Sequence, residues 1–167
     1  RYCYRGPKLA RVLTLDPGNS TGWLYRDAQG VLFGGTIYED IQRVHQLFND
    51  LDIDVVVYET FHLYAGAAKS MINNDFYPCQ VIGAIKLSTL IRGIPYLVPL
   101  SPGIKRYSGG IDDRWKEFRR DANMAEDAGI YAVTEHTKDA YLLLCYYERF
   151  VEKNPKRKEK CHTPAKM

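Results

Sequence analysis

The sequence has no long apolar run and few cysteines, and both absences narrow the classes of protein that it can encode. No stretch of its 167 residues approaches the roughly 20 consecutive apolar residues that a membrane-spanning helix needs, and the first residues hold no apolar core of signal-peptide length. The four cysteines are scattered without a CxxC spacing, which argues against a zinc ribbon and against the disulfide framework of a small secreted domain. We therefore expect a soluble intracellular protein without a membrane partner.

A strong net charge, internal repeats and low-complexity segments are also missing. Hydrophobic residues make up 46% and charged residues 26% of the chain, near the averages of globular proteins, so disordered, collagen-like and coiled-coil chains are excluded. The length suits one ordinary domain and would be short for two. We expect a folded domain over residues 1–152 and a basic, flexible tail over residues 153–167.

Basic residues exceed acidic ones by only three, but they are grouped along the chain. Residues 149–160 contain six basic and two acidic side chains. The densest part of this group is Lys156, Arg157 and Lys158. A second group begins with Lys105 and Arg106 after a Pro-Gly turn. Such groups attract the phosphate backbone of nucleic acids, although a solvated helix end followed by a disordered tail would have the same composition.

Turn residues divide the chain into alternating strands and helices. The predicted strands are 9–15, 21–26, 31–38, 53–58 and 96–100, of which the first three form an antiparallel meander. The predicted helices are 41–51, 78–92, a helix capped by Ser101 with Pro102 at its first position, 112–127, and a last helix capped by Thr134. The run over 53–58 is apolar almost throughout, which is typical of a strand buried on both faces. This order predicts an α/β fold with a mixed five-stranded sheet flanked by helices.

Three acidic residues stand at the ends of these elements. Asp16 ends the first strand within LTLDPGNSTG, and Glu59 ends the buried strand within VVVYETF. Asp139 lies in the first turns of the last helix, on the same stripe as Leu143, and so faces inward. Sites in open α/β sheets form at the carboxyl ends of strands. If the first and fourth strands are neighbours, Asp16 and Glu59 lie side by side, and the docked last helix adds Asp139.

Three converging carboxylates repel one another, so burying them is costly without cations. Mg²⁺ or Mn²⁺ suits such a site, and two ions about 3.5–4 Å apart would clamp the attacking and leaving oxygens of a phosphodiester. His136, one turn before Asp139, is expected to be a further ligand or a proton shuttle to the leaving oxygen. Gly18 and Gly22 are expected to leave room for a backbone turn and for a phosphate close to Asp16. Each of these features alone is more often a turn, a solvated strand end or a core residue, and their joint order favours a catalytic site.

With these motifs the chain resembles the RuvC-type Holliday junction resolvases, which have the RNase H-like fold. The resemblance spans residues 10–150 and depends on LTLDPGNSTGW, VVVYET and HTKDAYLLL. Asp16, Glu59 and Asp139 match the carboxylates of the family, and His136 stands where the family has an acid or a histidine. The Gly-Gln start of the family's dimer helix is matched only in part, by Cys79-Gln80.

The resemblance implies a homodimer that binds a four-way DNA junction and nicks two strands symmetrically. It implies that Lys105 contacts DNA and that an aromatic side chain soon after the strand-ending glutamate wedges into the junction, with Phe61 the first candidate and Tyr64 the second. We also expect Asn19 and Ser20 to donate hydrogen bonds to the scissile phosphate. Such a protein would work in the cytoplasm or on the nucleoid, or inside the host cell if it comes from a phage or a virus.

The leading interpretation is a metal-dependent, structure-selective endodeoxyribonuclease in which Glu59 or Asp16 helps to orient the attacking water. A second interpretation is an RNase H-like nuclease that acts on RNA, as in ribosomal RNA processing, and RNA cleavage by a monomer would distinguish it. A third is a branched-DNA-binding module without catalysis, which a metal-dependent cleavage assay would separate. A fourth is an α/β protein with a small-molecule site, since fold alone does not fix function.

Overall fold

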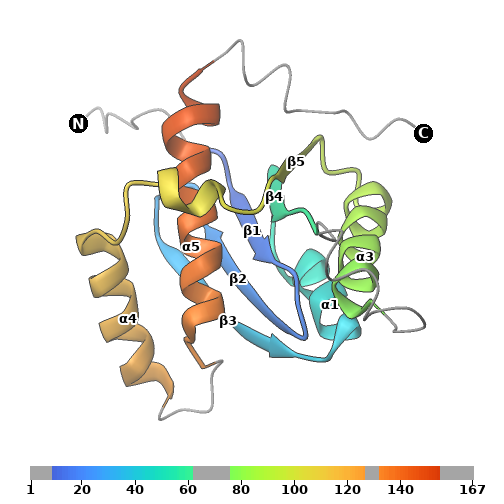
Figure 1. The fold of residues 1–167 in the computed structure, drawn as a ribbon, viewed down its shortest axis with the longest axis horizontal. Coiled ribbons are helices and arrows are strands. Elements are labelled where there is room, and N and C mark those ends of the chain that lie inside the picture. Colours follow the sequence, from blue (N-terminus) through green and yellow to red (C-terminus); the bar gives the residue numbers. More distant parts are fainter. Residues whose placement is uncertain (1–8, 62–75, 127–131, 155–167) are drawn as a thin grey trace, which may run out of the picture.

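The computed structural model describes residues 9–61, 76–126 and 132–154 (Figure 1). Four of the predicted DNA-binding residues lie outside these ranges: Tyr64, Lys156, Arg157 and Lys158. The division into a domain over 1–152 and a tail over 153–167 stays a prediction. No helix within the described ranges is both long and apolar enough to span a membrane.

Five strands form one mixed sheet in the order β3-β2-β1-β4-β5. They are β1 (Val12–Asp16), β2 (Ser20–Arg26), β3 (Leu32–Tyr38), β4 (Val55–Glu59) and β5 (Tyr96–Leu100). β1, β2 and β3 pair antiparallel, whereas β4 runs parallel to both β1 and β5. The predicted sheet is therefore confirmed. Its first strand begins at Val12 rather than Leu9, because the partner strand β4 begins only at Val55, opposite Val12.

Helices cover both faces of this sheet. They are α1 (Ile41–Asp50), α3 (Tyr77–Ile91), α4 (Asp113–Glu126) and α5 (Glu135–Tyr147), with the 3-10 turn η2 (Ile104–Tyr107) and the π-helical turn η3 (Glu148–Glu152). α1 and α3 pack together on one face, and α5 crosses the other with α4 beside it (Figure 1). The central strand is buried on both sides, since Val12 packs beneath α5 while Leu13 and Leu15 pack beneath α1 and α3.

Of two predicted helix starts, the structure confirms one and contradicts the other. The hydroxyl of Thr134 accepts a hydrogen bond from the backbone N–H of His136, so the predicted cap of the last helix is confirmed. Ser101 and Pro102 do not begin an α-helix, and that prediction was wrong. Gly103 after them adopts a left-handed conformation (φ 82°), and only the single 3-10 turn η2 follows.

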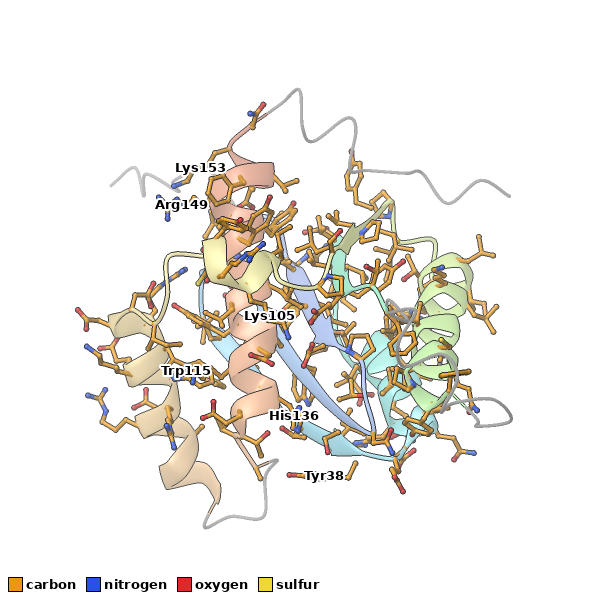
Figure 2. All side chains as sticks on the ribbon, viewed as in Figure 1. Tyr38, Lys105, Trp115, His136, Arg149 and Lys153 are labelled. Carbon is orange, nitrogen blue, oxygen red and sulfur yellow. The ribbon has the colours of Figure 1, made fainter. Side chains whose placement is uncertain are left out.

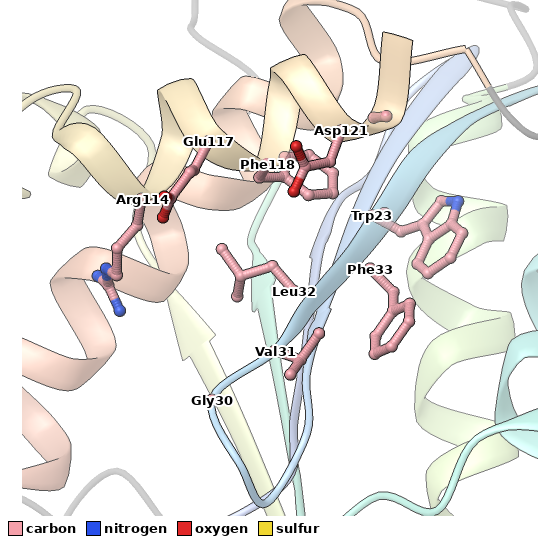
Figure 3. A pocket seen from close by; sticks show the side chains of 11 residues that line it. Trp23, Gly30, Val31, Leu32, Phe33, Arg114, Glu117, Phe118 and Asp121 are labelled. Atoms are coloured by element: carbon pink, nitrogen blue, oxygen red, sulfur yellow. The ribbon is translucent and has the colours of Figure 1, made fainter. Parts of the chain in front are cut away.

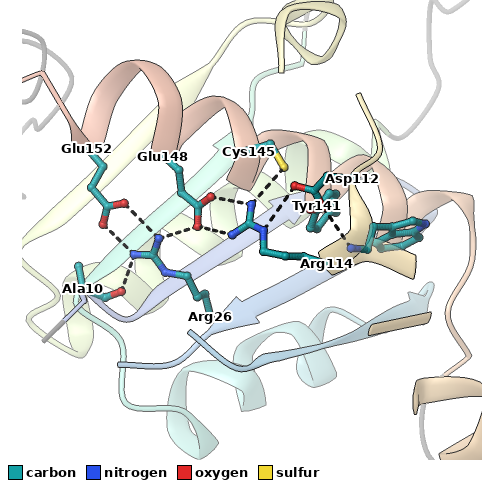
Figure 4. Close-up of polar contacts among 9 residues, drawn as sticks. Ala10, Arg26, Asp112, Arg114, Tyr141, Cys145, Glu148 and Glu152 are labelled. Atoms are coloured by element: carbon teal, nitrogen blue, oxygen red, sulfur yellow. Dashed lines mark hydrogen bonds and ion pairs between the residues drawn. The ribbon is translucent and has the colours of Figure 1, made fainter. Parts of the chain in front are cut away.

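A buried arginine anchors the carboxyl end of the last helix to the sheet (Figure 4). The guanidinium of Arg26 on β2 donates to Glu148 at 2.6 Å, to Glu152 at 2.7 Å and to the backbone carbonyl of Ala10 at 2.8 Å. Glu148 also accepts a hydrogen bond from Arg114 of α4 at 2.9 Å. α4, α5 with η3, and the β2 strand are thereby connected through two arginines and two glutamates.

Candidate active site

The parallel pairing of β1 with β4 brings the first two carboxylates together. Leu15 lies opposite Tyr58 in this pair, so the next residues, Asp16 and Glu59, lie side by side at the carboxyl ends of the two strands. Both strands are held in place by side chains buried on both faces of the sheet. The two carboxylate side chains are each 15% exposed, so they stand at the boundary between core and solvent.

The third carboxylate arrives with α5, which packs directly on β1 and β2. The hydroxyl of Thr14 in β1 donates to the backbone carbonyl of Ala140 at 2.9 Å, which fixes α5 next to Asp139. A Cβ atom on Gly22 of β2 would overlap the backbone carbonyl of His136. Gly22 is therefore needed for the close approach of α5, and the expectation that it makes room for a phosphate was wrong.

A lysine lies where the three carboxylates converge. The ammonium of Lys105, carried by η2, donates to Asp16 Oδ1 at 2.8 Å and to Asp139 Oδ2 at 3.0 Å, and it forms an ion pair with Glu59 Oε2 at 2.6 Å. Its side chain is only 20% exposed. Figure 2 shows Lys105 in front of the sheet beside α5. The side chain expected to contact DNA is thus directed at the carboxylates, and no pattern in the sequence indicated this.

Burial and neighbouring charges shift the pKa values of two of these groups, Asp16 and Lys105. Burial and a hydrogen bond with Glu59 raise the pKa of Asp16 to about 7, although attraction by Lys105 opposes the shift. Burial on its own would lower the pKa of Lys105, but the attraction of Asp16 and the hydrogen bonds to the three carboxylates outweigh it and raise that pKa. Lys105 is therefore charged at neutral pH, while Asp16 exchanges a proton in the same range.

The chemistry of the three side chains suits a hard divalent cation, because carboxylate oxygens are the ligands that Mg²⁺ and Mn²⁺ prefer. Among the described residues, however, no set of three His, Cys, Asp or Glu side chains is already arranged to hold a metal ion. The oxygens lie 2.6–3.0 Å from the Lys105 nitrogen, distances suited to an ammonium and longer than the roughly 2.0–2.1 Å of Mg²⁺–oxygen bonds. A metal ion here would have to replace the ammonium and draw the oxygens inward.

His136 lies one helical turn before Asp139 but outside the contacts of Lys105. Its side chain is exposed, and its backbone serves the helix cap and the packing against Gly22. Figure 2 shows it near the amino end of α5. Its expected role as ligand or proton shuttle stays a prediction.

The predicted DNA-binding residues near the site have varied surroundings. Asn19 is exposed, and its side-chain amide donates to Glu39 at 3.0 Å. Ser20 is half-buried as the first residue of β2. Phe61 is 37% exposed, so an aromatic surface is available just after Glu59. Arg106 is exposed, with its guanidinium 4.9 Å from the ring centroid of Tyr107.

A polar hollow of about 260 Å³ continues from η2 and was missed as a site in the sequence. Its lining residues are Ser108, Gly109, Gly110, Asp112, Arg114, Cys145, Glu148, Arg149 and Lys153. Arg149 and Lys153 are exposed and lie together at the carboxyl end of α5 and η3 (Figure 2). The basic residues from Arg149 onward indicated a positively charged surface there. They did not indicate that the loop after η2 would line the same hollow.

A larger, mainly apolar cavity of about 560 Å³ lies elsewhere, between the edge of the β2–β3 hairpin and α4 (Figure 3). Val31, Leu32 and Phe33 line it from the hairpin, and Phe118 lines it from α4. None of the three carboxylates contributes to it, so it is separate from the candidate active site.

Comparison with known proteins gives matches in structure alone. No family model matches the sequence, and no curated protein sequence matches it. RuvC of Thermus thermophilus in complex with a Holliday junction substrate is similar to this chain, with a TM-score of 0.59 and 14% identity over 92% of this chain and 99% of RuvC. Another structure of the same bacterium's RuvC has a TM-score of 0.51 and 15% identity over the same shares.

A third, weaker match is the yeast mitochondrial Holliday junction resolvase Ydc2, with a TM-score of 0.47 and 15% identity over 84% of this chain and 78% of Ydc2. The two RuvC matches span nearly the whole of both chains. The sheet order, the helices on both faces and the two RuvC matches together show that the protein has the RNase H-like α/β fold seen in RuvC.

Proposed function

We propose that the protein is a metal-dependent endodeoxyribonuclease that resolves four-way or otherwise branched DNA by paired, symmetric nicks. The observation that carries the proposal is the convergence of Asp16, Glu59 and Asp139 on one cation at the carboxyl ends of β1 and β4. The fold supports it, because a structure of the similar RuvC contains a Holliday junction substrate. Carboxylates gathered at such a position are typical of phosphodiester hydrolysis assisted by metal ions.

Four residues would have defined roles in the proposed cleavage. Asp16, Glu59 and Asp139 would hold two Mg²⁺ or Mn²⁺ ions, which supply charge stabilisation and an activated water when bound. Glu59 or Asp16 would help to orient the attacking water from its strand end. His136, exposed one turn from Asp139, would pass a proton to the leaving oxygen.

DNA would lie across the surface around η2. Arg106, Arg149 and Lys153 are exposed, and none forms an ion pair with another described residue. Glu148 and Asp112, the acids of the adjoining hollow, are engaged by Arg26, Arg114 and Tyr141, which leaves the basic side chains to attract phosphates. Phe61 would contact the branch point, and the tail residues outside the described ranges would add further phosphate contacts.

A homodimer would supply the second active site that paired nicks require. The carboxyl half of α3 exposes three apolar side chains, with Leu87 57%, Leu90 42% and Ile91 64% exposed. Residues spaced by three and four positions lie on one face of a helix, so these three side chains form a continuous stripe. Exposed apolar stripes of this kind are typical of protein interfaces, and we propose that two copies pair through α3.

Labelled synthetic four-way junctions with Mg²⁺ or Mn²⁺ test the proposed activity. We expect the wild-type protein to make paired nicks and the Asp16→Asn variant to lose cleavage by at least about a hundredfold while it still binds junctions, because one metal-binding carboxylate is gone. Asp113→Asn is the matched control, since Asp113 is an exposed acid of α4 whose side chain is 96% accessible. This control should cut like the wild type.

Other outcomes would change the proposal in defined ways. Equal cleavage of forks and flaps would keep the nuclease but broaden its substrate to branched DNA in general. Absence of cleavage on every DNA substrate with either metal would contradict the proposal and direct the assay to RNA.

A further inference from the structure

We propose that Lys105 is a displaceable internal counter-ion, whose release from the three carboxylates couples metal binding to DNA binding. The inference deepens the proposed function and rests on it for the identity of the second ligand. Its starting point is that one ammonium contacts Asp16, Glu59 and Asp139 at 2.6–3.0 Å, at the point where a metal ion would lie.

The net charge of the site favours exchange of the Lys105 ammonium for a divalent metal ion. Three carboxylates and one ammonium sum to −2 when all are ionised, so Lys105 compensates only part of the charge that it gathers. A divalent cation would compensate more, and it prefers the same oxygens. The two cations cannot occupy one position, and like charges at such distances repel strongly where solvent is largely excluded. Entry of the metal therefore requires the ammonium to leave.

The backbone around Lys105 allows the side chain to move alone. The carbonyl of Lys105 accepts hydrogen bonds from the backbone N–H of Ser108 at 3.1 Å and from its hydroxyl at 2.7 Å. These bonds hold the 3-10 turn, and the flexible four-carbon stem of the lysine can carry its ammonium away from the carboxylates. Metal binding would then reposition one ammonium without rearranging the fold.

The released ammonium has a defined anionic partner in the proposed complex. Lys105 is followed by exposed Arg106 and by the loop that lines the hollow with Arg149 and Lys153, where a phosphate backbone would lie. In the absence of metal, the carboxylates hold the ammonium and compete with the phosphates for it. Metal would therefore tighten DNA binding and DNA would tighten metal binding by the same factor, because coupling between two equilibria is reciprocal.

The first test measures metal binding without DNA. Calorimetric titration with Mn²⁺ should show roughly tenfold tighter binding to Lys105→Met than to the wild type, because a competing cation of the site is removed. Lys105→Arg, which keeps the positive charge, should bind Mn²⁺ close to the wild-type affinity. Arg106→Met is the matched control on the same turn and should leave Mn²⁺ affinity unchanged. Circular dichroism establishes that each variant is folded.

The second test measures junction binding with and without Ca²⁺, which takes the same kind of oxygen ligands. The wild type should gain affinity when Ca²⁺ is added, and Lys105→Met should lose most of that gain. Arg106→Met should bind more weakly by the same factor in both conditions. Folded Lys105→Met that binds Mn²⁺ no more tightly than the wild type, or that keeps the full Ca²⁺-dependent gain, would overturn the inference.

The two proposals fail separately. If the wild type cuts junctions but the Lys105 variants show neither effect, the nuclease stands and the counter-ion role is wrong. If Lys105→Met binds Mn²⁺ more tightly but the wild type neither binds nor cuts branched DNA, the exchange with metal stands and the proposed substrate is wrong.

Discussion

The pKa of Asp16 is set by burial and by its two neighbours, Glu59 and Lys105. Burial and the hydrogen bond with Glu59 disfavour its charge, and Lys105 offsets this only in part, which leaves the pKa at about 7. In the unfolded chain Asp16 has an ordinary aspartate pKa. The folded protein therefore keeps a proton on Asp16 over a pH range in which the unfolded chain has already released it. This difference predicts how the stability of the metal-free protein depends on pH.

Because the folded-state pKa is raised, the stabilising contribution of Asp16 is fully present below about pH 4 and is lost as the pH rises to about 7. Asp16→Asn removes this titration. We therefore expect the unfolding free energy of wild type relative to Asp16→Asn to fall between pH 4 and pH 7 and to stay constant above, in urea unfolding with EDTA. A difference that does not change with pH would contradict a raised pKa of Asp16.

The sequence was informative about which acids meet, but not about what lies between them. Asp16, Glu59 and Asp139 could be predicted as neighbours because strand ends and helix stripes follow regular periods. Lys105 could not, because the direction of one side chain on a 3-10 turn depends on tertiary packing that no local period encodes. The resemblance to a family suggested DNA contact for the same residue.

At the scale of elements, α5 is held against the hairpin at both ends. Near its start the hydroxyl of Thr36 on β3 lies 2.6 Å from that of Thr134 and 3.0 Å from that of Thr137. Near its end Arg26 binds Glu148 and Glu152 of η3. At the amino end, Gly22 also allows the backbone of β2 to approach the α5 backbone at His136. Asp139 is therefore positioned by a helix that has little freedom to shift.

Gly22→Ala tests this packing. The added methyl group would overlap the His136 carbonyl, which is backbone and cannot rotate away, so α5 must move. We expect a loss of roughly 1–3 kcal/mol in unfolding free energy, together with reduced junction cleavage as Asp139 moves away from Asp16. Gly83→Ala on α3, where a Cβ meets no other atom within 4 Å, is the control for folding and should be neutral or stabilising.

The order and type of most elements could be predicted because turn residues and apolar periods are local signals. Val12–Asp16 and Val55–Glu59 overlap the predicted strands 9–15 and 53–58 but begin two or three residues later, and the Thr134 cap lies where it was predicted. The helix predicted after Ser101 failed because the left-handed Gly103 changes the chain direction. The need for Gly22 could not be predicted either, since the sequence does not say which helix will pass over which strand.

At the scale of the whole molecule, the stripe on α3 predicts the assembly. Replacing Leu87 and Ile91 together by aspartate should produce a monomer in light scattering, because two charges would face each other across the proposed interface. The monomer should bind junctions more weakly and lose the pairing of its nicks. Val31→Asp, another exposed apolar position, is the control and should leave the oligomeric state unchanged.

An unchanged dimer in the double variant would place the interface elsewhere, and a monomeric wild type would contradict the proposed pairing. No local signal in the sequence distinguishes an apolar helix that packs inward from one that also meets a partner. α3 packs inward through the buried Val81 and Ile85, and it leaves Leu87 and Ile91 exposed for the proposed partner.

The distribution of the carboxylates along the chain has a consequence for synthesis on the ribosome. Asp16 belongs to the first strand, whereas Asp139 belongs to the last α-helix. One face of the central strand β1 is not covered until that helix docks. While α5 is still inside the ribosome, the nascent chain would have Asp16 and Glu59 but not yet Asp139 at the site. One apolar face of its sheet would be exposed. Under the proposed activity, the growing polypeptide cannot cleave DNA until the region that carries Asp139 has been translated and α5 has docked.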